Sequence, residues 1–284
     1  MLSQEQMSFY HENGYLVVDE VLSADELAEL RRVTDEFVER SRQVSQHNEV
    51  YDLEANHSAQ RPRLRRIKNP IAQHEVYERT LRHPGILDRV EQLIGPGLRR
   101  QNTKLNMKEP DHGSAVEWHQ DWAFYPHTND DVLAVGVCLD DMTEENGCML
   151  MVPGSHKGDL YSHHENGVFV GAVSDPDFAP GETAKCLVKA GGITIHHART
   201  LHASTPNHSA NPRRLLLFEY CSLDSWPLLG DSYEAYCDSV LRGEPSVRPR
   251  TSVAPVIIPL PKPENAGSIF EIQESLRHKD MARQ

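Results

Sequence analysis

Two potential metal ligands stand close together in the segment Glu117-Trp118-His119-Gln120-Asp121-Trp122. In an extended strand successive side chains alternate, so His119 and Asp121 would share one face and Gln120 would take the other. An imidazole and a carboxylate in this relation can occupy two positions around one metal ion. A His-x-Asp tripeptide also arises by chance, so the pair needs a further ligand before it indicates a metal site.

Three histidines downstream are candidates for that further ligand: His196, His197 and His202. Two histidines and one carboxylate on one face of an iron ion form the facial triad of non-haem Fe(II) oxygenases, which leaves the opposite face open. Arg213 follows these histidines, and its planar guanidinium can hold a carboxylate through two hydrogen bonds. The residue types are therefore those of an iron site with a carboxylate cosubstrate.

Four stretches that contain these residues resemble one known family. They are FYHENGYLVVDEVLSADELAELR (9–31), WHQDW (118–122), EENGCMLMVPGSHKG (144–158) and GGITIHHARTLHAS with the later Arg (191–213). In this order and spacing they resemble the phytanoyl-CoA dioxygenase family, whose members are Fe(II)- and 2-oxoglutarate-dependent oxygenases on a double-stranded β-helix.

The resemblance selects among the candidates. It implies that His202 is the third ligand, because Ser204 and Arg213 follow it at the family's spacing, and that His119, Asp121 and His202 bind Fe(II). It further implies that Arg213 and Ser204 bind 2-oxoglutarate, and we expect Gln120 and Lys104 to contact this cosubstrate as well. The implied reaction consumes O2, hydroxylates an unactivated C–H bond of a small molecule, and releases succinate and CO2. The carboxylate of Asp121 favours hydroxylation over halogenation, since related halogenases carry a small residue there.

Candidate substrate contacts lie beside the ligands and in a basic run. Trp122, Phe124 and Tyr125 directly follow the first ligand pair, where they would line the mouth of the site or pack in the core. A run of cations in an acidic protein includes Arg66, and we interpret it as a loop at the same mouth that contacts an anionic part of the substrate. A solvated loop is the alternative. The cations of the run are Arg61, Arg63, Arg65, Arg66 and Lys68.

Three other functions share these side chains. One is a cupin-like metalloenzyme that does not use 2-oxoglutarate, against which Arg213 and Ser204 argue. The second is a Zn-dependent hydrolase with the same three ligands. The third is a catalytically silent family member that serves as a binding module. Succinate formation from 2-oxoglutarate, compared between Fe(II) and Zn(II), separates all three from the oxygenase.

Composition and net charge limit the classes of partner that we expect for this protein. The chain has 284 residues, 38% of them hydrophobic, and a formal net charge of −13. This charge argues against binding nucleic-acid phosphates. Neither a membrane-spanning run nor a signal-peptide profile is present, so we expect a cytoplasmic protein without a membrane partner. The expected partner is a small-molecule substrate that could be anionic, and the sequence leaves a homodimer open.

The elements that must position the site follow from periodicity and turn signals. Helical spacing and capping boxes predict helices in the first 98 residues. Strands are predicted from Arg99 onward, as in 102–108, 132–139, 148–152, 193–195 and 213–220. We predict a mainly β fold with flanking helices, in which N-terminal helices brace a double-stranded β-helix, a jelly-roll and cupin-like core. One dioxygenase domain would span 1–284: helical support and loop in 1–98, core in 99–222, and a C-terminal extension in 223–284.

Overall fold

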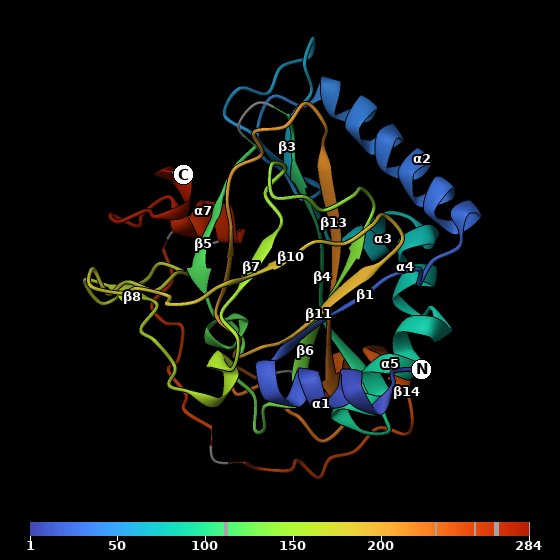
Figure 1. Cartoon of the computed structure of the whole chain (residues 1–284), viewed down its shortest axis with the longest axis vertical. Helices are drawn as coiled ribbons and strands as arrows, with labels where there is room; N and C mark the ends of the chain where they lie inside the picture. The colour runs from blue at the N-terminus through green and yellow to red at the C-terminus, as the bar shows by residue number, and fades with distance from the viewer. Residues whose placement is uncertain (111–112, 231, 253, 264–266, 284) are drawn as a thin grey trace.

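The computed structural model describes all residues of 1–284 except 111–112, 231, 253, 264–266 and 284. Its described residues form two main antiparallel sheets, as the mainly β prediction requires (Figure 1). The major sheet has the strand order β1-β11-β6-β13-β4-β3-β2, with β14 pairing to β4, and the minor sheet has the order β10-β7-β12-β5. The bounds in the major sheet are β1 Tyr15–Val18, β2 Tyr51–Leu53, β3 Leu64–Lys68, β4 Leu98–Lys108, β6 Val132–Cys138, β11 Ile193–His197, β13 Arg213–Ser222 and β14 Val240–Arg242. Those in the minor sheet are β5 Val116–His119, β7 Met149–Met151, β10 Ala184–Cys186 and β12 His202–Ser204, and a small hairpin joins β8 His164–Glu165 to β9 Val168–Phe169. This is the double-stranded β-helix, with the two sheets as its walls.

Side-chain alternation gives the major sheet two different faces. Leu105 and Met107 of β4 and Phe218 of β13 belong to the large apolar core that the helices also enter. The alternate residues of β4, among them Lys104 and Asn106, point to the other face and line an internal cavity. Because the two faces of a strand are set by a period of two, a polar inner face can coexist with a continuous core on the outside.

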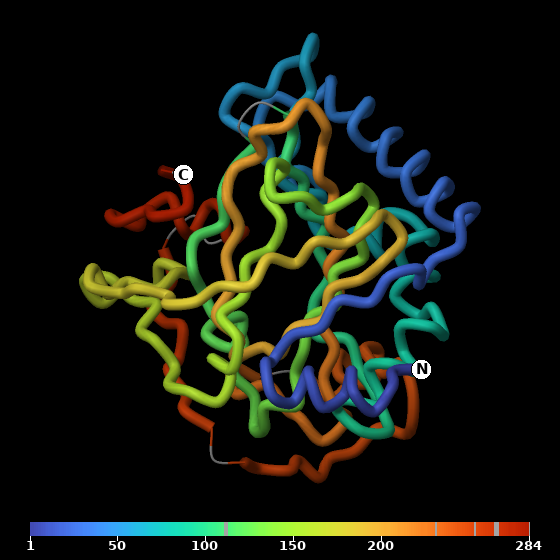
Figure 2. Tube along the Cα trace, in the orientation of Figure 1, coloured from blue at the N-terminus to red at the C-terminus, as the bar shows by residue number. Residues whose placement is uncertain are grey.

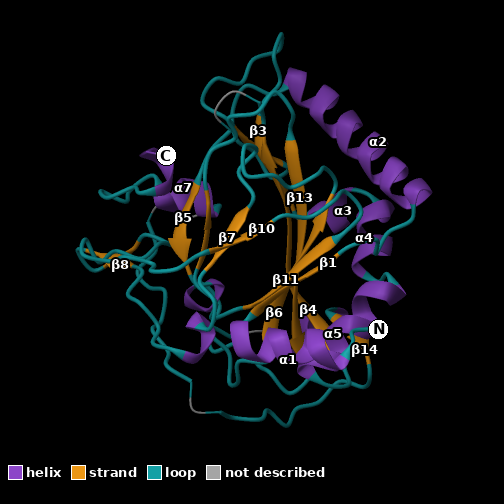
Figure 3. Cartoon of the chain, in the orientation of Figure 1, coloured by secondary structure: helices purple, strands orange, loops and turns teal. Residues whose placement is uncertain are grey.

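Helices from the first part of the chain cover the outer face of the major sheet, on the right in Figures 1 and 3. Their bounds are α1 Gln4–Asn13, α2 Ala24–Arg40, α3 Pro70–Gln73, α4 Glu75–Leu81 and α5 Pro84–Ile94. The predicted capping box of α2 is present, with Ser23 and Glu26 bonded reciprocally. Leu30, Val33 and Phe37 of α2 are buried in the core at helical spacing. Within the described ranges, no helix combines the length and apolarity that crossing a bilayer requires.

The first 98 residues contribute strands to the major sheet as well as the predicted helical support. β1 pairs with β11, and β2 and β3 extend the sheet beyond β4. The basic run predicted as a loop is largely strand β3, in which Leu64 and Ile67 are fully buried and Arg65 and Arg66 are also buried. The density of positive charge and the lack of a period of two in this segment gave no strand signal in the sequence.

The C-terminal extension wraps around the barrel and returns to the minor sheet, as the orange-to-red tube in Figure 2 shows. It contains α6 Tyr233–Asp238 and α7 Ile269–Gln273, and α7 lies beside β5. The carboxylate of Glu117 accepts hydrogen bonds from the backbone N–H groups of Asp280, Met281 and Ala282, at 2.8–3.0 Å. A strand residue next to the predicted metal ligand thus holds the end of the chain in place.

Candidate active site

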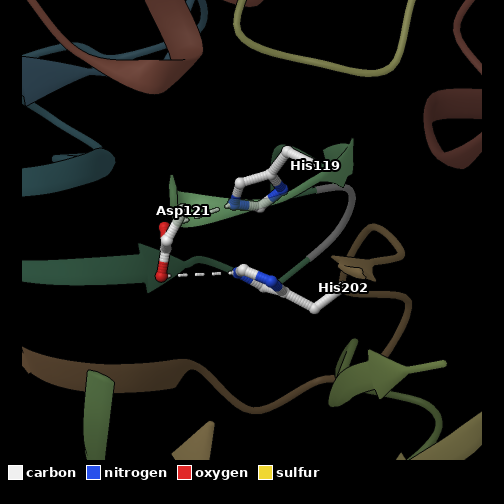
Figure 4. A group of neighbouring side chains, drawn as sticks. All are labelled: His119, Asp121 and His202. Carbon is white, nitrogen blue, oxygen red and sulfur yellow. Dashed lines mark ion pairs between the residues drawn. The ribbon is translucent and has the colours of Figure 1, made fainter. Parts of the chain in front are cut away.

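The side chains of His119, Asp121 and His202 converge on one point (Figure 4). His119 ends β5, His202 begins β12, and the two residues are directly opposite in the antiparallel pair. Their ligand atoms all lie within 4.8 Å of one another, and Asp121 Oδ1 is 3.8 Å from His119 Nε2. Asp121 lies in a short 3-10 turn (121–123) rather than in a continued strand. The backbone bend after His119 brings the carboxylate beside both imidazoles.

Both histidines are oriented for metal binding by the same local hydrogen bond. Nδ1 of His119 donates to the carbonyl oxygen of Glu117 at 2.8 Å, and Nδ1 of His202 donates to that of Thr200 at 2.9 Å. Each Nε2 atom is then left with a lone pair that faces the common point. Burial lowers the pKa of His119 to about 4 and, with help from the neighbouring histidines, holds the pKa of His202 well below its usual value. Both rings are therefore neutral ligands at pH 7.

The carboxylate of Asp121 is kept ionised by its neighbours. Burial raises its pKa, but Lys104, His202 and His196 outweigh burial and hold the pKa well below its usual range. His196 Nε2 donates to Asp121 Oδ2 at 3.1 Å. His196 is thus placed as a partner of the carboxylate, and His197 lies with its Nε2 atom 4.0 Å from Asp130. Of the three candidate histidines, only His202 belongs to the group of three potential ligands.

These potential ligands face a small, partly open cavity of about 40 Å³. By the usual requirement of ~10–15 Å³ per water molecule, it has room for about three. Strands of both sheets and the C-terminal helix α7 supply the lining. It consists of Lys104, Asn106, Lys108, Val116, His119, Asp121, Met149, His196, His202, Ala203, Ser204, Arg213, Leu215, Leu217, Ile269 and Phe270.

Arg213 and Ser204 meet at one part of this cavity, as predicted for a cosubstrate clamp. Arg213 is 3% exposed, its Nη2 donates to the Gly147 carbonyl oxygen at 2.8 Å, and its buried Nε has no partner among the described residues. Gly147 has φ 76°, and a Cβ there would lie within 3 Å of the carbonyl oxygens of Thr205 and Pro206. The turn therefore needs glycine at position 147, where the carbonyl oxygen supports the Arg213 guanidinium.

Arg214 has the opposite role, because it points out of the cavity. Its guanidinium bonds Asp140 at 2.8 Å and Asp35 at 2.6 Å, so its charge is fully paired. Arg213 keeps an unpartnered buried N–H instead. This orphaned donor and the donor set of two imidazoles and one carboxylate fit the groups that the sequence implies, 2-oxoglutarate and Fe(II).

Strand β4 presents Lys104, Asn106 and Lys108 to the cavity, and of these only Lys104 was predicted to contact the cosubstrate. Lys104 lines the cavity, but its Nζ is paired with Glu219 at 2.6 Å and is 4.0 Å from Asp121. It therefore lies at the metal site and its charge is already compensated. Lys108 was not among the predicted site residues, although the polar face of β4 was a visible signal for it.

Two of the predicted contact residues do not line the cavity. Gln120 points away from the cavity: its Nε2 donates to the carbonyl oxygens of Asp159 and Arg199, and its Oε1 accepts from Tyr161 N–H at 3.0 Å. Its amide is thereby saturated and holds neighbouring loops, so it cannot contact a cosubstrate in the cavity. Trp122 is fully buried and its Nε1 donates to the Pro255 carbonyl oxygen at 2.8 Å. It packs under the C-terminal extension and does not line the cavity.

The remaining predicted substrate contacts surround the cavity without lining it. The ring of Phe124 lies 6.0 Å from that of His119. The hydroxyl of Tyr125 is buried, and burial followed by the charges of Asp121 and Glu219 raises its pKa well above the usual value. Both remain candidate contacts.

Arg66 lies behind the residues that line the cavity and does not line the cavity itself. Its Nε donates to Asn106 at 2.9 Å, and its guanidinium lies 5.4 Å from the centre of the Phe270 ring. It therefore positions two lining residues rather than contacting the cavity. Phe270 and Ile269 themselves form part of the wall from the C-terminal extension. No local sequence signal predicted this, because the contact depends on the path of the preceding chain.

Comparison with known proteins gives the family of the chain. The sequence profile described as phytanoyl-CoA dioxygenase (PhyH) matches residues 10–215. A protein of Stutzerimonas stutzeri, named as a probable alpha-ketoglutarate-dependent hypophosphite dioxygenase, is 38% identical over 97% of this chain and 98% of its own.

Solved structures agree in fold. The non-heme alpha ketoglutarate dependent carbocyclase SnoK is 26% identical with a TM-score of 0.64, over 79% of this chain and 85% of its own. The epimerase SnoN in complex with Fe3+ and alpha ketoglutarate is 23% identical with a TM-score of 0.64, over 89% of this chain and 94% of its own. With the family profile matching most of the chain and a relative similar over nearly its full length, this protein belongs to the phytanoyl-CoA dioxygenase family.

Proposed function

We propose that the protein is an Fe(II)- and 2-oxoglutarate-dependent dioxygenase that oxidises a small molecule. The observation that carries the proposal is one cavity lined by two neutral imidazoles, one carboxylate and a buried arginine whose Nε has no partner among the described residues. Bound iron supplies the redox chemistry by which one oxygen atom of O2 enters succinate and the other enters the substrate. The balance is 2-oxoglutarate, O2 and R–H giving succinate, CO2 and R–OH.

The residues of the chain have separate parts in this reaction. His119, Asp121 and His202 hold the metal, and the hydrogen bond from His196 fixes the carboxylate. Arg213 and Ser204 hold the far carboxylate of 2-oxoglutarate, so that its keto acid end is directed to the metal.

The direct test is succinate formation by the purified protein with 2-oxoglutarate, compared between Fe(II) and Zn(II). Succinate formation is expected with Fe(II) and not with Zn(II). Product formation with Zn(II) would support a hydrolase, and substrate oxidation without 2-oxoglutarate would support the cupin-like alternative. Binding of a small molecule without turnover under either metal would support a silent family member.

Hypophosphite is the second, more specific proposal for the substrate. Its support is the 38% identity to a probable hypophosphite dioxygenase over nearly the whole of both chains. Hypophosphite has one phosphorus and two oxygens, and oxidation of one P–H bond to P–OH would give phosphite with the same consumption of O2 and 2-oxoglutarate. It would also be an anionic substrate, as the sequence suggested.

The two substrate proposals differ in their products. If hypophosphite is the substrate, it should stimulate succinate formation and yield phosphite in equal amount, detectable by 31P NMR. If the substrate is an organic molecule with an unactivated C–H bond, hypophosphite should leave the basal consumption of 2-oxoglutarate unchanged. A library of small organic acids and amino acids would then be the next screen.

A further inference from the structure

Two cations face each other inside the cavity. Lys108 of β4 and Arg213 of β13 are register partners in the antiparallel pair, and both line the cavity. Lys108 is 1% exposed and Arg213 is 3% exposed. Directly opposite residues on one face of a sheet have Cβ atoms about 4.5–5.5 Å apart, and like charges there are destabilising. Burial and the charge of Arg213 hold the pKa of Lys108 well below its usual value, and an anion bound between the two side chains would offset this effect.

The described part of the chain supplies no ion pair to either cation. The acidic side chains whose charges act on Lys108 include Glu54 and Glu117. The carboxylate of Glu54 accepts hydrogen bonds from the N–H and hydroxyl of Ser114, and that of Glu117 accepts from backbone N–H groups of the C-terminal segment. Both are therefore committed elsewhere, and an anion that enters the cavity would be the first direct partner of the two cations.

We propose that Lys108 and Arg213 together form a two-cation receptor for the far carboxylate of 2-oxoglutarate. This proposal rests on the proposed function, and it adds Lys108 as a binding residue that sets selectivity for a dicarboxylate. A single guanidinium with Ser204 would accept a neutral polar end more readily than two buried cations do. Two cations leave a strong electrostatic penalty for any keto acid that lacks the second carboxylate.

The present contacts of Lys108 are compatible with this role. Its Nζ donates to the backbone carbonyl oxygens of Ser204 and Thr205. An ammonium group has three N–H donors, so these bonds leave one for a ligand. The same bonds hold Nζ next to Ser204, whose side chain lines the cavity. The alternative is that Lys108 only ties β12 to β4 through these carbonyl groups.

The test measures binding rather than activity. Calorimetric titration of the Mn(II)-loaded protein under argon gives Kd for 2-oxoglutarate and for 2-oxopentanoate, which has the same carbon chain without the second carboxylate. Lys108→Met is compared with Lys185→Met, in which an exposed lysine of β10 is lost with the same change in net charge. Thermal unfolding of each metal-free variant reports on the structural alternative.

Lys108→Met is expected to raise Kd for 2-oxoglutarate at least about tenfold, which corresponds to 1.4 kcal/mol. Its Kd for 2-oxopentanoate should change far less, so the preference for the diacid shrinks. Lys185→Met should leave both constants unchanged. A lowered melting temperature with an unchanged preference for the diacid would overturn the proposal in favour of the structural tie. Absence of 2-oxoglutarate binding by the wild-type protein would instead contradict the proposed function itself.

Discussion

The adjacent arginines of β13 provide an internal comparison for the cosubstrate clamp. Arg213 faces the cavity with an unpartnered N–H, whereas Arg214 faces outward and is paired with Asp35 and Asp140. Replacing Arg213 with Ala should raise the 2-oxoglutarate concentration needed for half-maximal succinate formation at least about tenfold. Arg214→Ala should change this concentration much less and should lower the unfolding free energy instead. Equal small effects of both variants on the 2-oxoglutarate requirement would remove the assignment of Arg213.

The neighbouring histidines give a second comparison. His202 belongs to the group of potential ligands, while His196 donates a hydrogen bond to Asp121. His202→Ala should therefore abolish stoichiometric binding of one metal ion, measured by titration of the metal-free protein with Mn(II) or Fe(II). Loss of a hydrogen bond to a ligating carboxylate typically weakens metal binding by roughly 10–100-fold, so His196→Ala should retain a weak site. Intact binding by His202→Ala, with loss in His196→Ala, would exchange their roles.

Spacing along one or two strands predicted which side chains share a face, and the structure brings His119, Asp121, His202, Ser204 and Arg213 together at the cavity. Gln120 was expected at the cosubstrate although strand alternation places it on the other face from His119 and Asp121, and its amide bonds backbone groups of nearby loops. Spacing identifies which side chains share a face, but it does not identify which hydrogen bonds a loop will offer them.

The basic strand β3 and the C-terminal helix α7 depend on each other. Arg65 is 3.2 Å from both Asp52 and Glu274, and its guanidinium lies 5.6 Å from the centre of the Phe270 ring. The side chain of Ser268 also donates to Asp52 at 2.5 Å. Positive charge that resembled a solvated loop in the sequence is thus used to seat a segment that closes the cavity. Periodicity predicted helices and inner strands, but a pairing of residues this far apart in the chain has no local signature.

Loss of Arg65 should weaken the packing of the C-terminal segment 268–283 against β3 without unfolding the barrel. In Arg65→Ala, amide hydrogen exchange across 268–283 is expected to accelerate at least tenfold, which corresponds to about 1.4 kcal/mol of lost protection. Exchange in β4, β6 and β13 should stay as in the wild-type protein. Arg79→Ala, which removes a surface ion pair with Glu29, is the matched control. Acceleration spread evenly over the barrel strands would indicate global destabilisation and contradict a local role.

The fold as a whole separates stability from chemistry. The outer face of the major sheet and the helices carry the large apolar core, so the inner face can hold cations, imidazoles and carboxylates. This separation has an electrostatic consequence, because buried histidines must stay neutral. Burial lowers the pKa of His127, His163 and His197, each to about 3. In the unfolded chain, these side chains return to the ordinary value of 6.5.

The sign of the resulting pH dependence follows from proton binding. Below pH 6.5 these histidines bind protons in the unfolded chain but stay neutral in the folded protein. The unfolding free energy therefore decreases as the pH falls below 6.5. One such histidine lowers the unfolding free energy by up to about 2 kcal/mol between pH 7 and pH 5. Burial raises the pKa of Glu109 to about 7, which acts in the opposite direction and offsets part of this loss. Because His127, His163 and His197 all lower the unfolding free energy on acidification and Glu109 offsets only part of this loss, the metal-free protein should be less stable at pH 5 than at pH 7.

Urea unfolding of the metal-free protein at several pH values tests this balance, and His127 allows its parts to be separated. Its Nδ1 donates to the Tyr125 carbonyl oxygen at 2.7 Å, and its Nε2 is 3.1 Å from the side chain of Gln101, away from the metal ligands. His127→Gln removes the titrating ring. The loss of unfolding free energy between pH 7 and pH 5 should therefore be ~2 kcal/mol smaller in this variant than in the wild-type protein, whatever the stability of the variant at pH 7. If the variant kept the wild-type slope, the acid sensitivity would have to arise from other groups, and His127 would not be held neutral by burial.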